Sequence, residues 1–250
     1  MKALITGASS GIGRDIARYL SQKGYDLVIV ARRQNLLEEL KKELKTNVQV
    51  EVMDVSDKNN CYKLAEKYPD IDVLINNAGF GKYGEFTKID IEEELDMINT
   101  NIVAVQFLTK LYLKNMEEKN KGYILNVASV AGLMQGGPLM TTYYASKSYI
   151  VSMTRGISEE LKIKNSDVHV CVLCPGPVAT NFNNVANVKF SIKQLSSEYV
   201  AKYAIDKMFK KKDIIIPGFL VKVLALAAKF APAKIVLYLA YKQQKKKGEG

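Results

Sequence analysis

The sequence predicts an α/β protein in which a doubly wound parallel sheet carries helices on both faces. Short apolar runs alternate with helical patterns over most of the 250 residues, which is typical of parallel strands joined by helical crossovers. A glycine-rich turn directly follows the first apolar run. No linker or internal repeat divides the chain, so one domain spanning residues 1–250 is the simplest organisation.

The composition excludes several classes of protein. Hydrophobic residues make up 48% of the chain and charged residues 25%, as in an ordinary globular protein. His169 is the only histidine, which excludes a Ser-His-Asp hydrolase and a metal site with several histidine ligands. Cys61, Cys171 and Cys174 are too few for a disulfide framework and predict a reducing compartment such as the cytoplasm. Cys171 and Cys174 stand three apart on one predicted strand and so face opposite sides, which predicts two core thiols and no metal site.

The first predicted strand, Lys2–Thr6, leads into the turn Thr6–Gly13 and a helix that ends near Gly24. Glycines let the backbone approach a ligand, and free N–H groups at a helix N-terminus attract an anion. The turn therefore predicts a phosphate site, with the spacing TGxxxGxG in place of the common fingerprint GxGxxG. The alternative is a plain strand-to-helix turn. Because Met1 leads straight into this strand, no signal peptide is expected.

Two arginines follow the second predicted strand, Asp26–Ala31, and begin a helix that runs to about Lys45. In dinucleotide-binding folds the end of this strand contacts the adenosine ribose. An acidic residue there accepts hydrogen bonds from the 2′-hydroxyl, whereas arginine suits a 2′-phosphate. Ala31 supplies no acid, and Arg32 and Arg33 supply two guanidinium groups. We therefore expect NADP(H) to be preferred over NAD(H); the alternative is that both arginines only solvate the start of the helix.

The same alternation continues through the rest of the predicted sheet. Further strands are expected at Val48–Met53, Ile71–Ile75, Tyr123–Val127, Asp167–Leu173 and Ile214–Ile216, which makes about seven in all. Further helices are expected after Ser56 as N-cap, over Asp90–Lys119, from near Tyr143 to Lys162, and from Ser196 to about Lys212. Together these elements predict a single-domain Rossmann-type fold.

Polar residues and glycines collect where the predicted strands end. In an open parallel sheet, ligands bind beyond the carboxyl ends of the strands. We therefore expect one ligand site to be lined by all of these residues. They are the glycine turn, Arg32, Asp54, residues 76–79, Ser129 and Pro175–Gly176.

Tyr143 and Lys147 stand four residues apart in a predicted helix, which places them on one face. A phenol ordinarily ionises near pH ~10, too high for acid–base work at neutral pH. An ammonium group one turn away favours the phenolate and brings the pKa of the phenol towards a catalytic range. The alternative is a surface aromatic beside a solvated lysine, so the residues around the pair decide its meaning.

Between Lys2 and about Thr180 the chain resembles the short-chain dehydrogenase/reductase family. Each motif is short, and their common order and rough spacing carry the match. The resemblance implies a nicotinamide-dependent oxidoreductase acting on CH–OH groups, with an Asn-Ser-Tyr-Lys tetrad. The motifs are Thr6-Gly7-Ala8-Ser9-Ser10-Gly11-Ile12-Gly13, Asp54-Val55, Asn76-Asn77-Ala78-Gly79, Asn101, Ser129, Tyr143-x-Ala145-Ser146-Lys147 and Pro175-Gly176-Pro177-Val178-Ala179-Thr180.

The resemblance implies a role for each member of the tetrad. Tyr143 gives its phenolic proton to a substrate carbonyl, or takes it from a hydroxyl in the reverse direction. Lys147 lowers the pKa of that phenol and bonds the nicotinamide ribose. Ser129 donates a hydrogen bond to the substrate oxygen, and Asn101 holds a water that links Lys147 to solvent. Tyr144 competes with Tyr143 for the first role, because it lies three residues from Lys147.

The cofactor-binding residues that the resemblance implies follow the same motifs. They are Gly7, Ser9, Ser10, Gly11, Ile12, Gly13, Arg32, Arg33, Asp54, Val55, Asn77, Ala78, Gly79, Tyr143, Lys147, Pro175, Gly176, Val178 and Thr180.

Three other functions compete with this one. A catalytically silent dinucleotide-binding sensor or interaction protein of the same fold is expected to lack the tyrosine or the lysine, and both are present. A nucleotide-sugar epimerase needs an added substrate domain, for which 250 residues leave no room. Nucleic-acid binding through the basic tail has no other support in the sequence, so no nucleic-acid partner is expected.

The positive charge of the chain lies in its last quarter. The formal net charge is +10, yet 22 basic residues balance 22 acidic ones up to Val188, and 14 lysines face four acids from Lys189 onward. Within this basic region, residues 181–195 are expected to form a substrate lid with an apolar lining; the alternative is an ordinary loop. Residues 218–243 are expected to form a helical C-terminal extension, with helices over Phe219–Lys229 and Pro232–Lys242.

The C-terminal extension has three alternative roles. Its apolar helices with single lysines can line the substrate pocket or contact another subunit. They can instead rest on an anionic membrane surface, or attract an acidic acyl carrier.

The sequence thus predicts an NADP(H)-dependent oxidoreductase, cytoplasmic or peripheral to a membrane, that interconverts a carbonyl and an alcohol by hydride transfer. Its substrate is a small molecule, and the apolar lid and tail favour a hydrophobic one. The resemblance implies a homodimer or homotetramer, because members of the family usually pack two long helices against a partner subunit.

Overall fold

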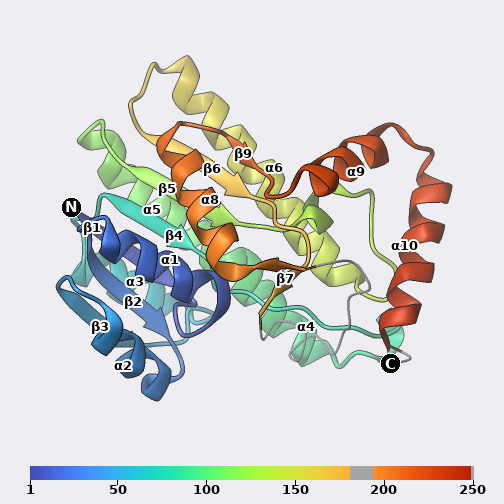
Figure 1. Ribbon diagram of the computed structural model, residues 1–250, viewed down its shortest axis with the longest axis horizontal. Coiled ribbons are helices and arrows are strands. Elements are labelled where there is room, and N and C mark those ends of the chain that lie inside the picture. The colour runs from blue at the N-terminus through green and yellow to red at the C-terminus, as the bar shows by residue number, and fades with distance from the viewer. Residues whose placement is uncertain (181–193, 249–250) are drawn as a thin grey trace.

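A sheet of parallel strands organises the fold (Figure 1). The computed structural model describes residues 1–180 and 194–248. Its seven-stranded sheet has the order β3-β2-β1-β4-β5-β6-β9, and every neighbouring pair is parallel. This confirms the predicted doubly wound, Rossmann-type sheet. The strands are Lys2–Thr6 (β1), Asp26–Ala31 (β2), Val48–Val52 (β3), Val73–Asn76 (β4), Tyr123–Val127 (β5), His169–Leu173 (β6) and Ile214–Ile215 (β9).

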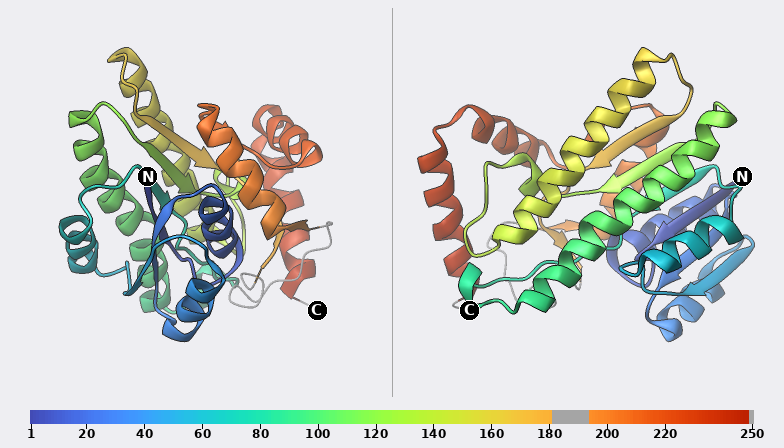
Figure 2. Two further views of the ribbon diagram at one scale, coloured as in Figure 1. Left: turned by 60° about the vertical axis from the view of Figure 1, so that its left-hand side comes forward. Right: turned by 180° about the vertical axis from the view of Figure 1, so that it is seen from behind.

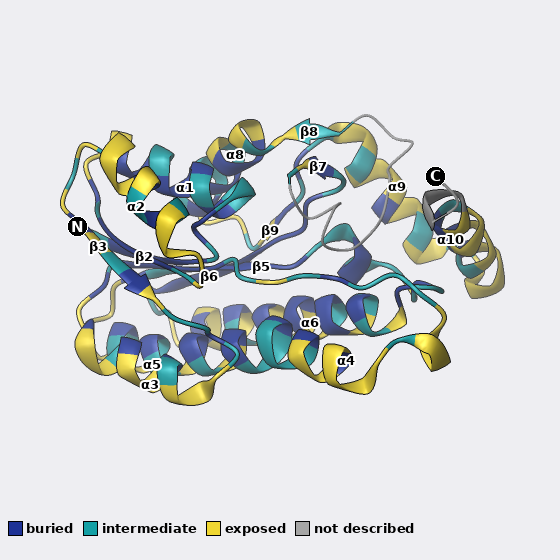
Figure 3. Ribbon diagram, turned by 90° about the horizontal axis from the view of Figure 1, so that it is seen from below, coloured by how far each residue is buried: buried dark blue, intermediate teal, exposed yellow. Residues whose placement is uncertain are grey.

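Helices cover both faces of this sheet, as Figure 3 shows. Figure 2 shows from behind that the long helices α5 (Ala104–Glu118) and α6 (Thr141–Ile163) cross one of the two faces. One face carries α1 (Gly11–Gln22), α2 (Gln34–Glu43) and α8 (Ser197–Phe209). The other carries α3 (Lys58–Lys67), α5 (Ala104–Glu118) and α6 (Thr141–Ile163).

The strands are apolar on both faces, as parallel strands between two helical layers must be. Ile5 packs against the layer of α1, Leu4 packs against the opposite layer, and neither has exposed surface. Burying one such side chain stabilises the fold by about 1.5–3 kcal/mol. Cys171 and Cys174 also belong to different clusters, which confirms that these free thiols are buried on opposite sides of the sheet.

The third helix begins later than the sequence suggested. Asp57 caps α3, because its Oδ1 accepts a hydrogen bond of 2.9 Å from the backbone N–H of Asn59. The prediction that Ser56 is the N-cap was therefore wrong. The backbone N–H of Ser56 donates to Oδ1 of Asp54 at 3.0 Å, so the chain makes one further turn before the helix starts.

The predicted helix over Asp90–Lys119 is one helical stretch with a π segment inside it. Here α4 (Ile91–Ile98) passes into the π segment Asn99–Val103 and then into α5. A π segment inserts one extra residue into an α-helix and is frequent at functional sites. In this chain it contains Asn101, whose side chain has no exposed surface.

The region after β6 contains a small pair of strands that the sequence did not reveal. Val178–Ala179 (β7) and Leu195–Ser196 (β8) pair in parallel beside the main sheet. Most of the predicted lid, residues 181–195, lies outside the described residues. The next helix, α8, begins where expected, with Oγ of Ser196 accepting a hydrogen bond from the N–H of Tyr199.

The C-terminal extension consists of two helices, as predicted. These are α9 (Phe219–Phe230) and α10 (Ala233–Gly248). Figure 1 places them at the end of the molecule opposite β3. Within residues 1–180 and 194–248, no helix is both long enough and apolar enough to cross a bilayer.

Candidate active site

One cavity of about 710 Å³ runs along the carboxyl ends of the strands. Of the predicted catalytic and cofactor-binding residues, all but Gly13 and Asn101 lie on its wall. Asn76, which was also expected at this edge, is instead buried, and its side-chain amide donates to Thr109 and Asn126. The predicted residues on the wall are Gly7, Ser9, Ser10, Gly11, Ile12, Arg32, Arg33, Asp54, Val55, Asn77, Ala78, Gly79, Ser129, Tyr143, Lys147, Pro175, Gly176, Val178 and Thr180.

The turns that follow β1 and β4 are hydrogen-bonded to each other. Oγ1 of Thr6 accepts from the backbone N–H groups of Asn77 and Ala78, at 3.0 and 3.1 Å. The side-chain amide of Asn77 donates in return to the carbonyl oxygens of Thr6 and Gly7, at 3.0 and 3.2 Å. These bonds fix the two turns at the point where the strand order reverses, which is where open α/β sheets bind ligands.

At its three glycine positions, the turn after β1 leaves no room for a side chain. Gly7 has a φ of +66°, and a Cβ there would lie 2.8 Å from Nδ2 of Asn77. A Cβ on Gly13 would lie 2.4 Å from the same nitrogen, which explains why Gly13 packs behind the turn and not in the cavity. Gly11 has a φ of +56°, and a Cβ there would lie 2.9 Å from Cγ2 of Thr180. The turn thus brings bare backbone to the N-terminus of α1, an arrangement that favours a phosphate group.

Arg33 lies over this turn. Its Nη2 donates to Oγ of Ser9 and Oγ of Ser10, both at 2.8 Å. A guanidinium group and two hydroxyls therefore meet at one edge of the cavity, close to the N-terminus of α1. The positive charge and the hydroxyl groups at this edge suit an anionic phosphate.

Arg32 points to a different partner and is more exposed. Its Nη1 lies 3.3 Å from Oδ2 of Asp54, and 72% of the Arg32 side chain is accessible to solvent. Partial burial tends to raise the pKa of Asp54, but hydrogen bonds from Ser56 and the charge of Arg32 outweigh it and hold that pKa below its ordinary value. The two arginines therefore differ: Arg33 contacts the phosphate turn, and Arg32 neutralises a carboxylate.

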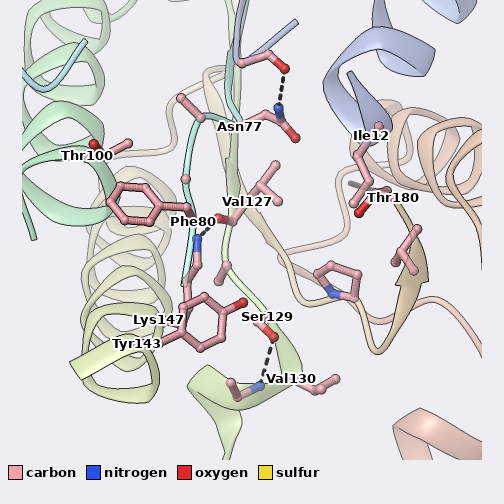
Figure 4. A pocket seen from close by; sticks show the side chains of 18 of the residues that line it. Ile12, Asn77, Phe80, Thr100, Val127, Ser129, Val130, Tyr143, Lys147 and Thr180 are labelled. Atoms are coloured by element: carbon pink, nitrogen blue, oxygen red, sulfur yellow. Dashed lines mark hydrogen bonds between the residues drawn. The ribbon is translucent and has the colours of Figure 1, made fainter. Parts of the chain in front are cut away.

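At the other end of the cavity, the side chains of Tyr143 and Ser129 lie close together (Figure 4), and their hydroxyl groups are hydrogen-bonded. Ser129 caps the short helix Val130–Leu133, because its Oγ accepts a hydrogen bond from the N–H of Ala131 at 3.1 Å. Burial raises the pKa of the Tyr143 phenol to about 12, although the hydrogen bond with Ser129 acts in the opposite direction. The phenol is therefore protonated at neutral pH.

Lys147 lies one turn further along α6, beside the ring of Tyr143. Its Nζ is 5.9 Å from the ring centroid and donates to the carbonyl oxygen of Val127 at 3.1 Å (Figure 4). Burial lowers the pKa of Lys147 to about 8. The expected lowering of the phenol pKa by this ammonium group is not what governs Tyr143, because desolvation of the phenol has the larger effect.

The side chain of Asn101 holds the segment that follows β4. Its Oδ1 accepts from the N–H of Phe80 at 3.0 Å, and its Nδ2 donates to the carbonyl oxygen of Phe80 and to Oγ of Ser146, at 2.9 and 3.1 Å. A Cβ on Gly79 would lie 2.8 Å from Oδ1 of Asn101 and 3.2 Å from Nζ of Lys147. Both amide hydrogens are thus used within the protein, and Gly79 lets Asn101 and Lys147 come close.

Tyr144, the competitor of Tyr143, faces the C-terminal helix. Its hydroxyl accepts a hydrogen bond of 2.9 Å from Nε2 of Gln244, and its ring packs on Gly137. The rings of Tyr143 and Tyr144 meet edge to face with centroids 6.2 Å apart. The structure therefore pairs Tyr143 with Ser129 and pairs Tyr144 with α10.

The sequence did not single out the residues by which the C-terminal helices line the cavity. Leu220 and Leu224 stand at helical spacing, which was the available signal, but nothing in the sequence showed which face turns inward. This placement agrees with the alternative in which the extension lines the pocket. The residues concerned are Leu220, Val221, Leu224 and Ala225 of α9 and Gln243 and Gln244 of α10.

Comparison with known proteins gives a consistent relationship. A sequence profile described as short chain dehydrogenase matches residues 1–189. The chain is 34% identical over 187 residues to the 3-oxoacyl-(acyl-carrier-protein) reductase of Haemophilus influenzae, covering 73% of this chain and 76% of that protein. It is 32% identical over 239 residues to the NADP-dependent 3-hydroxy acid dehydrogenase of Schizosaccharomyces pombe, covering 87% and 90%. A solved structure of a short-chain dehydrogenase from Sphingobium yanoikuyae in complex with NADPH matches 90% of this chain and 91% of its own, at 25% identity and a TM-score of 0.81.

Proposed function

This chain belongs to the short-chain dehydrogenase family, and from that premise we propose that it reduces a hydrophobic ketone to an alcohol, with NADPH as hydride donor and Tyr143 as general acid. As a member of this family it is an oxidoreductase acting on CH–OH groups. One observation carries the proposed cofactor and general acid. A single cavity has Arg33 with two serines at one end and Tyr143 with Ser129 at the other.

The two ends of the cavity are separated along the sheet edge. Arg33 follows β2 and Ser129 follows β5, and three strand spacings lie between these strands in the sheet order. At roughly 4.8 Å per strand this is about 14 Å. An elongated ligand with phosphates in its middle fits between them, because the glycine turn at the end of β1 lies on the same edge.

The residues present fit a bound dinucleotide. The crowded glycines at positions 7 and 11 leave backbone at the N-terminus of α1 for the pyrophosphate, and Lys147 is placed for the ribose next to the nicotinamide. When bound, NADPH supplies the hydride, while the protein supplies position and electrostatic field. The NADPH-bound relative from Sphingobium yanoikuyae supports this assignment.

A preference for NADP(H) over NAD(H) follows from the end of β2. Ala31 places no carboxylate there to accept hydrogen bonds from a ribose 2′-hydroxyl. Arg33 is already positioned by Ser9 and Ser10 and offers a planar set of donors for a 2′-phosphate. The relative from Schizosaccharomyces pombe is named as NADP-dependent, which supports the same preference.

Proton transfer is assigned to Tyr143. Because burial keeps its phenol protonated at neutral pH, Tyr143 is in the form that reduction requires. Its Oη gives the proton to the substrate oxygen as the carbonyl carbon is reduced, and the hydroxyl of Ser129 donates a hydrogen bond to the same oxygen. That hydrogen bond stabilises the negative charge that develops on the oxygen. Asn101 acts further away, by fixing the backbone at Phe80 next to Lys147.

The substrate end of the cavity favours an apolar molecule. Leu220, Val221 and Leu224 of α9 form one wall, and Met134 and Met140 lie on the cavity as well. The relatives named above act on a 3-oxoacyl group and on 3-hydroxy acids. We therefore place the substrate among ketones with an acyl chain. The three free, buried thiols support a reducing, cytoplasmic setting. The homodimer or homotetramer that the family resemblance implies completes the proposal.

Cofactor oxidation tests the proposal directly. Purified protein would be mixed with NADPH or NADH and a panel of short and long 3-oxoacyl thioesters and simple ketones, or with NADP⁺ or NAD⁺ and a panel of hydroxy acids. The absorbance of the reduced cofactor would be followed in each case. We expect turnover with NADPH and an increase in kcat/KM with chain length. No oxidation with any ketone, or a clear preference for NADH, would overturn the corresponding part of the proposal.

A further inference from the structure

The outward face of α9 and α10 carries a broad group of exposed apolar side chains, here called the hairpin patch. Phe219 and Phe230 at the two ends of α9 are 85% and 78% exposed. Soluble monomers rarely expose contiguous apolar surface of this kind without a binding function. Figure 3 shows α9 and α10 at the edge of the molecule with much of their surface exposed. The hairpin patch consists of Phe219, Val223, Leu226 and Phe230 of α9 and Ile235, Tyr238 and Leu239 of α10.

The hairpin patch is one-sided on each helix. On α9, its four members recur at positions i, i+4, i+7 and i+11, which line a single face. On α10, Ile235, Tyr238 and Leu239 recur at i, i+3 and i+4, while Val236 and Ala240 are buried on the other side. Each of the two helices therefore presents its exposed apolar residues as one stripe, not as a scatter of single residues.

Lysines surround this apolar surface, and acidic residues are missing from it. Residues 219–248 contain seven lysines and no aspartate or glutamate. Lys222 and Lys229 are exposed and lie seven apart on α9, along one side of the apolar stripe. Nζ of Lys242 lies 4.8 Å from the centroid of the Tyr238 ring. Apolar side chains that penetrate and lysines that stay near the surface are the pattern of a helix lying in the interface of an anionic membrane.

The inner face of the same helices lines the cavity. Val221 and Ala225 stand on the side of α9 opposite the hairpin patch and border the cavity, as does Gln244 on α10. A single layer of helix therefore separates the cavity from any surface that covers the hairpin patch.

We propose that the hairpin patch docks onto an anionic lipid bilayer, with α9 and α10 lying in its interface, and that the enzyme takes its substrate from that bilayer. The second half of this inference rests on the proposed function; the docking does not. A second copy of this chain fits the patch poorly, because it would bring lysines against lysines with no acid in either hairpin. An acidic carrier protein would neutralise the lysines, whereas an anionic bilayer would both neutralise them and bury the exposed rings of Phe219 and Phe230.

Vesicle flotation tests the docking. The full chain would be mixed with phosphatidylcholine vesicles with and without phosphatidylglycerol, at low and high salt. We expect it to float with the anionic vesicles and to be released in part by salt. The double variant Leu226→Glu/Phe230→Glu should lower the bound fraction at least about tenfold, because each side chain contributes burial in the interface. Neither residue borders the cavity, so turnover of a water-soluble ketone should not change.

A matched control separates docking from a general effect of charge. Ile163 at the end of α6 is 75% exposed and lies outside the hairpin patch, so Ile163→Glu should float like the unaltered protein. Equal loss of binding in both variants would overturn the proposal, as would a full-length protein that floats with neither vesicle. A concentration-dependent dimer that the double variant abolishes, without vesicle binding, would assign the patch to a second copy and overturn it too. Binding of a purified acidic acyl carrier protein without vesicle binding would also overturn it.

The outcomes distinguish this inference from the proposed function. Turnover of NADPH with a soluble ketone but no flotation would leave the oxidoreductase standing and remove the docking. Flotation without turnover would support the docking and remove the proposed oxidoreductase activity. If both hold, adding a ketone with a long acyl chain to anionic vesicles should give a kcat/KM that falls in the double variant and stays constant in the Ile163→Glu control.

Discussion

The hydroxyl of Tyr144 and the side-chain amide of Gln244, 100 residues apart in the chain, are joined by a hydrogen bond of 2.9 Å. This bond ties α10 to the helix that carries the catalytic candidates. It also settles the orientation of two adjacent tyrosines, since Tyr144 turns towards α10 and Tyr143 turns towards Ser129. Two residues that look alike in the sequence are thereby given different environments.

Phenylalanine at Tyr143 should abolish proton transfer. We expect kcat for reduction to fall by a factor on the order of 10²–10⁴, because the substitution removes the hydroxyl that is hydrogen-bonded to Ser129. Tyr144→Phe is the matched control: it removes the bond to Gln244 and should change KM more than kcat. Steady-state kinetics with saturating NADPH measure both. Full activity in Tyr143→Phe would rule out its assignment as general acid.

Alanine at Arg33 should weaken the use of NADPH selectively. The guanidinium that contacts Ser9 and Ser10 is the group placed for a 2′-phosphate. Its loss should raise KM for NADPH about ten- to a hundredfold, as expected when a charge-assisted pair is removed, and leave KM for NADH nearly unchanged. Arg32→Ala, which loses an exposed pair with Asp54, should have a smaller effect. Equal losses with both cofactors in Arg33→Ala would contradict the proposed selectivity.

The rate of reduction should fall as the pH rises above about 8. Burial lowers the pKa of Lys147 to about 8, so the charged form that is proposed to hold the ribose is lost through that range. The folded chain then releases a proton that the unfolded chain still binds, so the contribution of Lys147 to the free energy of unfolding grows as the pH rises. The loss of rate is therefore not explained by unfolding. A pH profile of kcat/KM, with circular dichroism at each pH, measures this; a flat profile from pH 7 to 9 would contradict it.

The single histidine should make the protein sensitive to mild acid. Burial lowers the pKa of His169, although its hydrogen bond to the carbonyl oxygen of Lys212 acts the other way. The unfolded chain therefore binds a proton more readily than the folded chain below about pH 6.5, and stability is lost as the pH falls through that value. His169→Gln should reduce the change in melting temperature between pH 7 and 5. The carbon-bound ring proton of this one histidine gives its pKa by NMR, and a value at or above the ordinary one would refute the argument.

The periodicity of the sequence was sufficient to predict the sheet and the edge of the sheet at which the cavity lies. Strand-forming runs such as Lys2–Thr6 are buried on both faces, so their apolar pattern is strong, and parallel topology then brings their carboxyl ends together. The sequence was less informative about where a helix begins when two neighbouring residues could each act as its N-cap. Ser56 and Asp57 are both capable N-caps, and the choice was made by Asp54, which takes the N–H of Ser56.

What the sequence could not supply depends on packing between distant segments. Helical spacing predicted that Tyr143 and Lys147 lie close, but not that both are buried, and burial is what moves the pKa of each group. In the same way, the apolar pattern of α9 did not show which of its sides borders the cavity. That side is fixed by contacts of the hairpin with the rest of the chain, including the bond from Gln244 to Tyr144.

The π segment at Asn99–Val103 has a bearing on how this chain tolerates changes of length. It accommodates one residue more than α geometry uses, so deleting one residue there should give a continuous α-helix and leave the relative rotation of α4 and α5 close to its present value. Met97, which packs with Tyr143 in one cluster, should therefore stay beside that ring. A deletion within α5 itself should be less well tolerated, because removing a residue from a regular α-helix turns its two parts by about 100° relative to each other.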